Sequence, residues 1–321
     1  MVSLKNGILL IALLFIITPI FAQEDEIKDE IKDEPEQELS NVQEYTPSKL
    51  LNKGQWDIKF FNGLYTETKS TDDGSKPVDI PRQTFFTNTT EIYTGVSENS
   101  RINIGLVFQV RANTFDGAKA LDAFNFKDNT TDARSGLTTI APSIRVQPFK
   151  NIANFSFTSS LFFPVFKDVP NAPYLDKRSI FWETKFFYDK TFGGGDWQLF
   201  TEADLGFNFG EKTIEADGSK ENLRERFANN SLSFPISVFL SYFPSYKSTI
   251  FINAQQSFFI GYDNPNSNGD NFSQDYTALG FGGKYQLTNT LNLEFSYNKF
   301  VRGHAFQGLG QTFSLGLRVI L

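Results

Sequence analysis

The sequence predicts an all-β protein, a transmembrane antiparallel β-barrel of about twelve strands, and three observations support that prediction. Segments of strand length alternate large apolar residues with small or polar ones. The connections between these segments alternate between long and short. The final segment, Gln311–Leu321, carries Phe313, Leu315 and Leu317 on one face. Because successive side chains of a strand point to opposite faces, each such segment can present one face to lipid and one to a lumen.

Composition favours strands over helices as the membrane-crossing elements. Aromatic residues make up 16% of the chain and Phe occurs 36 times, yet the mean hydropathy is only −0.29. A barrel reconciles these facts, since only alternate residues meet lipid while lumen and loops stay polar. The net charge of −7 argues against a nucleic-acid partner.

The sequence is poor in the residues that metal and thiol chemistry use. It contains no Cys, a single Met at position 1 and a single His, His304. Disulfides, thiolate ligands and a Cys nucleophile are therefore excluded, and His-ligated transition metals are disfavoured. We expect no cofactor and no metal site.

Residues 1–22 have the pattern of a secretory signal peptide. Lys5 supplies the positive charge, Gly7–Phe21 is the apolar stretch, and Ala22 is a small residue before the expected cleavage point. The alternative is a signal anchor, but the apolar run is short for a spanning helix, which needs ~20 residues. No other stretch is long and apolar enough, so membrane insertion must use strands.

Residues 23–50 are predicted to form an acidic, disordered periplasmic leader. Residues 24–34 are an acidic repeat with little apolar content, which favours a solvated chain. The alternative is a helix that docks or plugs at the barrel mouth, because Ile27 and Ile31 are four residues apart and can share a helix face.

Residues 51–321 are predicted to form the barrel. In its clearest segment Ile102, Ile104 and Leu106 share one face, and Asn103 and Arg111 lie on the other. Each segment is long enough, since a tilted strand crosses a membrane in about 9–11 residues. The predicted strands are about 55–69, 84–97, 101–114, 137–149, 154–166, 180–192, 197–211, 231–244, 249–262, 276–288, 291–302 and 307–321.

The connections alternate in length along the chain. Bacterial outer-membrane barrels have short periplasmic turns and long external loops, and an even strand count places both ends of the barrel domain on the periplasmic side. A soluble β-sandwich would not keep this alternation. Long connections are predicted at 70–83, 115–136, 167–179, 211–230 and 263–275, and short ones at 98–100, 150–153, 193–196, 245–248 and 288–290.

On these features, residues 55–321 resemble a bacterial outer-membrane β-barrel, with a Phe- and Asn-rich style similar to Bacteroidota examples. The layout is also similar to twelve-stranded transporter-like barrels of the meta-pathway phenol-degradation group. The features that carry the resemblance are the signal end Phe21-Ala22-Gln23, the alternating connections and the strand Gln311–Leu321. Such barrels usually end on an aromatic residue, whereas this sequence has Leu321. The resemblance implies the outer membrane of a Gram-negative bacterium, with lipid and the assembly machinery as partners.

Charged residues of the predicted inner face are grouped by sign. Acidic residues concentrate on the sixth and seventh strands and basic residues on the third and fourth, and a wall of each sign would orient or filter charged solutes. The alternative is that they pair and fill the interior, as in small barrels. The predicted lumen-lining residues are Asp57, Lys59, Arg101, Arg111, Arg145, Glu183, Lys185, Glu202, Asp204, Lys284, Glu294 and Arg318. Arg318 and Asp57 are expected to face each other across the seam between the last and first strands.

The same alternation places six aromatic residues inside the barrel. They would form a slot for aromatic or amphipathic solutes. A register shift of one residue would instead turn each of them to lipid. The six are Phe61, Phe85, Phe187, Phe200, Phe239 and Phe251.

The function expected from these features is passive passage of a small amphipathic or aromatic solute, without enzymatic chemistry. The alternative is a structural or partner-binding barrel with a closed lumen and functional external loops. A third hypothesis is an outer-membrane hydrolase that uses His304 as its base. No Ser-containing motif surrounds His304, and the loop that holds it accounts for it.

Overall fold

The structure is a computed structural model that describes residues 48–167, 172–210, 230–261 and 272–321. The predicted signal peptide and most of the predicted acidic leader lie outside the described residues. No helix within the described ranges is long and apolar enough to span a membrane.

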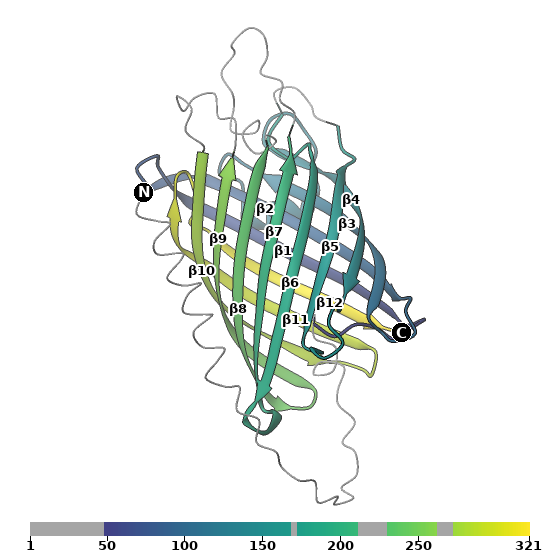
Figure 1. The fold of residues 1–321 in the computed structure, drawn as a ribbon. Coiled ribbons are helices and arrows are strands. Elements are labelled where there is room, and N and C mark those ends of the chain that lie inside the picture. The colour runs from purple at the N-terminus through teal and green to yellow at the C-terminus, as the bar shows by residue number, and fades with distance from the viewer. Residues whose placement is uncertain (1–47, 168–171, 211–229, 262–271) are drawn as a thin grey trace, which may run out of the picture. The chain divides into compact units, whose positions relative to one another are not determined.

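Twelve antiparallel strands in the described part of the chain form a closed barrel (Figure 1). Each strand pairs with its neighbours in sequence, and β12 pairs with β1. The predicted fold class is confirmed. The strands are β1 (Trp56–Thr71), β2 (Pro77–Gly95), β3 (Ile102–Thr114), β4 (Ala133–Val146), β5 (Phe155–Pro164), β6 (Ile180–Phe192), β7 (Trp197–Phe209), β8 (Ser231–Ser245), β9 (Ser248–Gly261), β10 (Phe272–Gln286), β11 (Leu291–His304) and β12 (Gln311–Ile320), with short 3-10 helices η1 (Ala120–Asn125) and η2 (Gly193–Gly195).

The seam between β1 and β12 closes the barrel without a free edge. Its register runs from Asp57 opposite Ile320 to Thr66 opposite Gln311. The backbone N–H of Trp56 donates to the carbonyl of Leu321 at 2.8 Å, so β12 ends beside the start of β1. Closure pairs every strand on both sides, which removes the edges that would otherwise aggregate.

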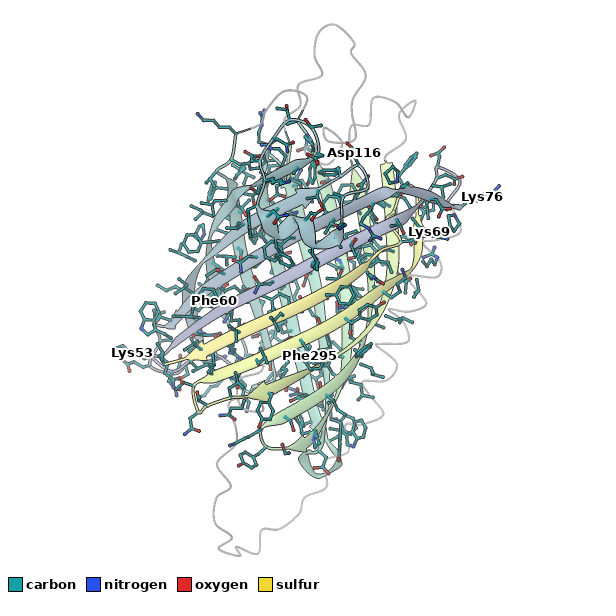
Figure 2. All side chains as sticks on the ribbon, turned by 180° about the vertical axis from the view of Figure 1, so that it is seen from behind. Lys53, Phe60, Lys69, Lys76, Asp116 and Phe295 are labelled. Atoms are coloured by element: carbon teal, nitrogen blue, oxygen red, sulfur yellow. The ribbon has the colours of Figure 1, made fainter. Side chains whose placement is uncertain are left out.

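The outer face of the barrel is apolar. Phe60 and Phe295 are both exposed and lie on outward positions of β1 and β11 (Figure 2). Trp56, Ile104 and Leu315 are also exposed. A contiguous exposed apolar surface of this kind is costly in water and is what a lipid-facing barrel presents.

One predicted long connection is short in the described part of the chain. Residues 70–83 are not a long loop, because β1 continues to Thr71 and β2 begins at Pro77. The hairpin closes in a tight turn, where the N–H of Lys76 donates to Asp72 Oδ1 at 2.7 Å. Continued ladder pairing overrides the turn propensity of these polar residues. Figure 2 shows Lys76 and Lys53 at opposite ends of the barrel.

The short turn between β6 and β7 depends on glycine. Gly193, Gly194 and Gly195 have φ values of +63°, +71° and +103°. Residues with a Cβ rarely adopt such backbone angles, so three consecutive glycines allow the chain to reverse in the minimum length. The prediction of a tight turn at 193–196 is therefore confirmed.

The segment that precedes β1 packs inside the barrel. Ser48, Leu50 and Leu51 are buried. Leu51 belongs to a cluster with the inner-face residues Tyr93 and Ile320. Residues 48–50, which fall in the predicted disordered leader, are thus packed against the barrel wall at the end where β1 begins.

Candidate functional site in the barrel lumen

Contacts between strands that are not neighbours identify the inner face. Arg145 on β4 forms an ion pair with Asp57 on β1, although β2 and β3 lie between them. Asn253 on β9 likewise donates to Asn298 on β11, 2.7 Å away. Such side chains can meet only across the interior, so the residues that alternate with them along each strand point outward.

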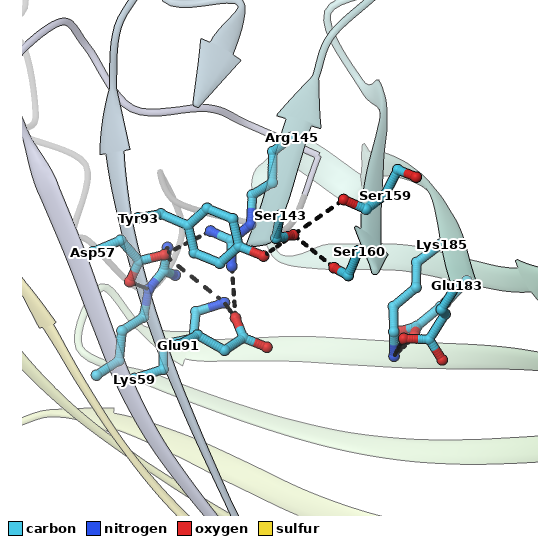
Figure 3. A network of polar contacts seen from close by, with 12 residues as sticks. Asp57, Lys59, Glu91, Tyr93, Ser143, Arg145, Ser159, Ser160, Glu183 and Lys185 are labelled. Atoms are coloured by element: carbon cyan, nitrogen blue, oxygen red, sulfur yellow. Dashed lines mark hydrogen bonds and ion pairs between the residues drawn. The ribbon is translucent and has the colours of Figure 1, made fainter. Parts of the chain in front are cut away.

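Five charged residues near the start of β1 form a group that we call the arginine network: Asp57, Lys59, Glu91, Arg145 and Arg318 (Figure 3). Arg318 donates from Nε and Nη2 to the two carboxylate oxygens of Asp57, at 2.8 and 3.1 Å. Arg145 donates to Asp57 Oδ2 at 3.0 Å and to Glu91 Oε2 at 2.6 Å. The Asp57 side chain is fully buried. Two acids and three bases give the network a formal charge of +1.

Tyr93 supports the arginine network from one side. The guanidinium of Arg145 lies 3.4 Å from the centroid of its ring, which is a close cation–π contact. The hydroxyl of Tyr93 donates to Ser143 Oγ at 2.6 Å, and Ser143 Oγ lies 2.6 Å from Ser160 Oγ. A Cβ at Gly105 would lie 2.5 Å from the Tyr93 ring, so only glycine permits this ring position. Tyr93 is not among the predicted lumen-lining residues, although it shares the inward parity of Glu91 along β2, which is a usable signal.

Four further charged residues form a second group, the acidic cluster: Glu183 and Lys185 on β6, and Glu202 and Asp204 on β7. The Lys185 Nζ lies 3.7 Å from Glu183, 3.5 Å from Glu202 and 3.5 Å from Asp204. Three acids and one base give it a formal charge of −2. Figure 3 shows Glu183 and Lys185 set apart from the arginine network.

The structure does not bring the three predicted basic residues together as one wall. Asn103, two residues after Arg101, pairs with Arg145, whereas Arg111 pairs with Gly136 farther along β4. Arg111 instead forms an ion pair with Asp176 at 3.0 Å. The reason is that Arg111 and Arg145 both lie near the C-terminal ends of two antiparallel strands, which places them toward opposite ends of the barrel. The remaining predicted pair, Lys284 on β10 and Glu294 on β11, is joined at 3.1 Å.

Part of the connection between β5 and β6 returns to the inner wall. Asn113 Nδ2 donates to the carbonyls of Tyr174 and Leu175, at 3.0 and 2.9 Å. Asp176 next to them holds Arg111. The ammonium of Lys177 lies 5.1 Å from the ring of Phe181, and burial lowers the pKa of Lys177. No periodic pattern in this connection indicated that it would contact the strands.

Aromatic side chains line two parts of the inner wall. Phe187, Phe200, Phe239 and Phe251 form a continuous row across β6 to β9, with successive centroid distances of 6.0, 5.5 and 5.6 Å. We call these four residues the aromatic row. A second series runs from Phe85 through Tyr65 and Phe300 to Tyr276, at 6.1, 5.0 and 4.6 Å. The inward register is thus the observed one, and the alternative of a one-residue shift is wrong for these positions.

A groove interrupts the wall between β4 and β5. Ile140 pairs with Phe163 and Ser143 with Ser160, but the residues between them do not pair across this boundary. Pro142, which has no N–H, lies in the gap. The groove has a volume of about 500 Å³ and is lined by Pro142, Ser143, Ile144, Ser159, Ser160, Leu161, Trp182 and Phe209. The exposed Trp182 and Phe209 place its mouth on the lipid-facing side.

His304 lies outside the barrel interior at the end of β11. Its Nδ1 is 3.9 Å from Asp275 Oδ2, and Asp275 is already held by Arg302 at 2.6 Å. Within the described residues, no serine hydroxyl hydrogen-bonds His304, so the arrangement lacks the nucleophile of a hydrolase triad. In the same part of the chain, no group of three or more His, Asp or Glu side chains is placed to hold a metal ion.

Comparisons with known proteins identify the fold. The sequence matches no protein-family model and no curated protein. The structure is similar to an outer-membrane channel from Pseudomonas putida F1, with a TM-score of 0.63, 12% identity, and coverage of 85% of this chain and 98% of that one. It is also similar to the β domain of the Bordetella autotransporter BrkA, with a TM-score of 0.50, 11% identity, and coverage of 82% and 98%.

The closed barrel, its apolar outer face and these structural similarities agree. The chain is an outer-membrane β-barrel, and its location is the outer membrane of a Gram-negative bacterium. The outer face of the barrel therefore contacts lipid.

Proposed function

We propose that the barrel is a passive channel for small amphipathic or aromatic solutes across the outer membrane. The observation that carries this proposal is that many inner-face charges keep contact with solvent. The side chains of Lys185, Lys284 and Glu294 are 35%, 36% and 34% exposed, although all three face inward. A filled interior would bury such groups in pairs, whereas a water-containing lumen leaves them accessible.

The aromatic row supports the solute class. Phe200 and Phe239 are partly exposed inner-face residues. A purely hydrophilic pore has no need of apolar rings on its wall, and rings partly open to a lumen offer stacking surfaces to apolar parts of a solute. Charged groups on the same face would orient its polar end.

A specific observation favours the alternative of a closed barrel that serves a structural or partner-binding role. Leu51 and the fully buried Asp57 occupy the interior near the start of β1, where the arginine network joins β1, β2, β4 and β12. In that case the external connections would carry the function. The charge exposure elsewhere in the lumen makes the channel our preferred proposal.

Single-channel recording on the purified full-length protein in planar bilayers distinguishes the open channel from the closed barrel. We expect discrete ionic conductance, with folding verified by the heat-modifiable gel shift of an intact barrel. A folded barrel that shows neither conductance nor flux of free phenylalanine, an aromatic zwitterion that crosses lipid poorly on its own, into liposomes would rule out the channel and leave the closed barrel.

Three finer assignments belong to the same proposal. The Phe- and Asn-rich strands support a Bacteroidota-type barrel, and the layout supports the transporter-like group related to phenol degradation. The amphipathic strand Gln311–Ile320 is what the outer-membrane assembly machinery would bind. The lumen side chains act by charge and stacking alone, so the proposal includes no enzymatic step.

A further inference from the structure

We propose that the acidic cluster and the aromatic row together form a binding subsite for an organic ammonium ion, specifically a primary amine attached to an aromatic or apolar body. This inference rests on the proposed function, because it names the solute class that the lumen would favour. Four observations carry it: three concern described residues of β6 to β9, and the fourth concerns the arginine network.

The first observation is a surplus of negative charge. Glu183, Glu202 and Asp204 surround a single ammonium, that of Lys185, at 3.5 to 3.7 Å. These separations are longer than a charge-assisted hydrogen bond of about 2.7–2.9 Å. Lys185 therefore lies among the three carboxylates without fully satisfying any of them, and a formal charge of −2 remains for a second cation.

The second observation is a buried oxygen without a donor. The Asp204 residue is only 6% exposed, and among the described residues no group hydrogen-bonds its Oδ1. A buried, unpaired carboxylate oxygen is costly. A primary ammonium carries three N–H donors and a positive charge, which is the chemistry that this oxygen and its neighbours lack.

The third observation is the position of the aromatic row relative to the carboxylates. Glu202 is the direct cross-strand partner of Phe187, whose ring stacks on Phe200. Phe200, Glu202 and Asp204 alternate along one face of β7, so each step between them is roughly 7 Å. A ligand with an ammonium group next to a single ring can therefore contact a carboxylate and the aromatic row at the same time. A ring face also attracts a cation directly.

The fourth observation is the sign of the other charged group in the lumen. The arginine network carries a formal charge of +1. An organic anion would be attracted there and repelled from the acidic cluster, whereas an organic cation prefers the acidic cluster. The presence of Lys185 within the cluster disfavours a divalent metal ion, since its ammonium occupies the centre of the three carboxylates.

The test uses three probes of nearly the same size: phenethylammonium, phenethyl alcohol and phenylacetate. Their binding to the full-length protein in lipid nanodiscs is measured by titration calorimetry. We expect phenethylammonium to bind at least tenfold more tightly than either analogue, because only it supplies the charged donor. Methylammonium, which lacks the ring, should bind more weakly than phenethylammonium.

The variants locate the subsite. The double substitution Glu202→Gln with Asp204→Asn should weaken phenethylammonium binding roughly tenfold or more and leave phenethyl alcohol unchanged. Glu202→Gln alone, at a more accessible position, provides a milder test if the double variant does not give a heat-modifiable barrel. Asp79→Asn, at the exposed tip of β2, removes one negative charge and is the matched control for Glu202→Gln alone.

The subsite would be overturned by equal affinity for phenethylammonium and phenethyl alcohol, or by unchanged phenethylammonium affinity in a folded double variant. Equal competition by sodium ions at the same concentration would also overturn it, because the site would then be a general cation site. Conductance is measured separately. A protein that conducts but shows no ammonium preference keeps the channel and loses the subsite, and one that binds phenethylammonium without conducting keeps the subsite and loses the channel.

Discussion

The arginine network and the acidic cluster both combine acidic and basic side chains on the inner wall, but they differ in how completely their charges are paired. In the network, Asp57 is fully buried and receives guanidinium donors from two strands at 2.8 to 3.1 Å. In the cluster, Lys185 remains 35% exposed and its nearest carboxylate oxygen is 3.5 Å away. The planar fork of Arg suits bidentate pairing with a carboxylate, whereas the Lys ammonium acts as a point charge.

The two groups therefore have different roles within one lumen. The network joins β1, β2, β4 and β12, so it holds together the first strands and the closing strand. The cluster joins only the adjacent strands β6 and β7 and keeps surplus charge. Satisfied charges stabilise a fold, whereas the partly exposed charges of Lys185 and Glu202 are available for a solute.

The largest effect expected from this comparison is on stability, at Asp57. Substitution Asp57→Asn leaves Arg145, Arg318 and Lys59 around a neutral amide, which should cost about 3–5 kcal/mol because three cations lose their buried counter-ion. The free energy of unfolding in urea, measured in lipid vesicles, reports it. Asp204→Asn is the matched control and should be neutral or slightly stabilising, since it relieves repulsion among three acids. Equal destabilisation by the two substitutions would remove the distinction between the two groups.

A smaller loss of stability is expected where the aromatic row meets β10. A Cβ at Gly282 would lie 2.3 Å from the carbonyl oxygen of Phe295 and 2.4 Å from the Phe251 ring, so Gly282→Ala must shift the neighbouring strand and displace that ring from its place in the row. Overpacking of this kind costs about 1–3 kcal/mol. Gly63→Ala is the control, because its added Cβ would meet no atom within 4 Å. Thermal stability of the heat-modifiable form, compared between the two variants, measures the difference. A Gly282→Ala protein as stable as Gly63→Ala would show that the ring of Phe251 does not depend on that glycine.

The sequence was sufficient for the fold and for the contact between Asp57 and Arg318. Alternation fixes which residues face inward, and closure of a barrel must place the last strand beside the first, so this pair followed without knowledge of any loop. The contacts of Arg145 with Asp57 and of Tyr93 with Ser143 could not be predicted in the same way. They reach across intervening strands, so they depend on strand stagger and side-chain reach, which periodicity does not encode.

The two predictions that the structure contradicts, the long connection at 70–83 and the wall of basic residues, fail for local physical reasons. Residues 70–83 contain Ser, Thr, Asp and Gly, which favour turns, yet Ser70 pairs with Val78 and Thr71 with Pro77, so the ladder continues into this segment. Strand position alone groups Arg111 with Arg101 and Arg145, but its partner Asp176 lies in a connection with no periodic pattern. Residues of irregular segments that return to a strand wall are the ones that sequence patterns miss.

The smallest loss of stability is expected at the ion pair between Lys284 and Glu294. Its size reports how much water this part of the lumen contains. Lys284 and Glu294 form a one-to-one pair at 3.1 Å, with both side chains about one-third exposed. Such accessible pairs contribute at most about 1 kcal/mol, so Glu294→Gln should change the free energy of unfolding by less than that. Raising the salt concentration from about 0.1 to 1 M should then remove the difference from wild type, because the screening length falls to about 3 Å. A salt-independent loss of several kcal/mol, approaching that of Asp57→Asn, would mean that this part of the lumen is dry and that the barrel is closed there.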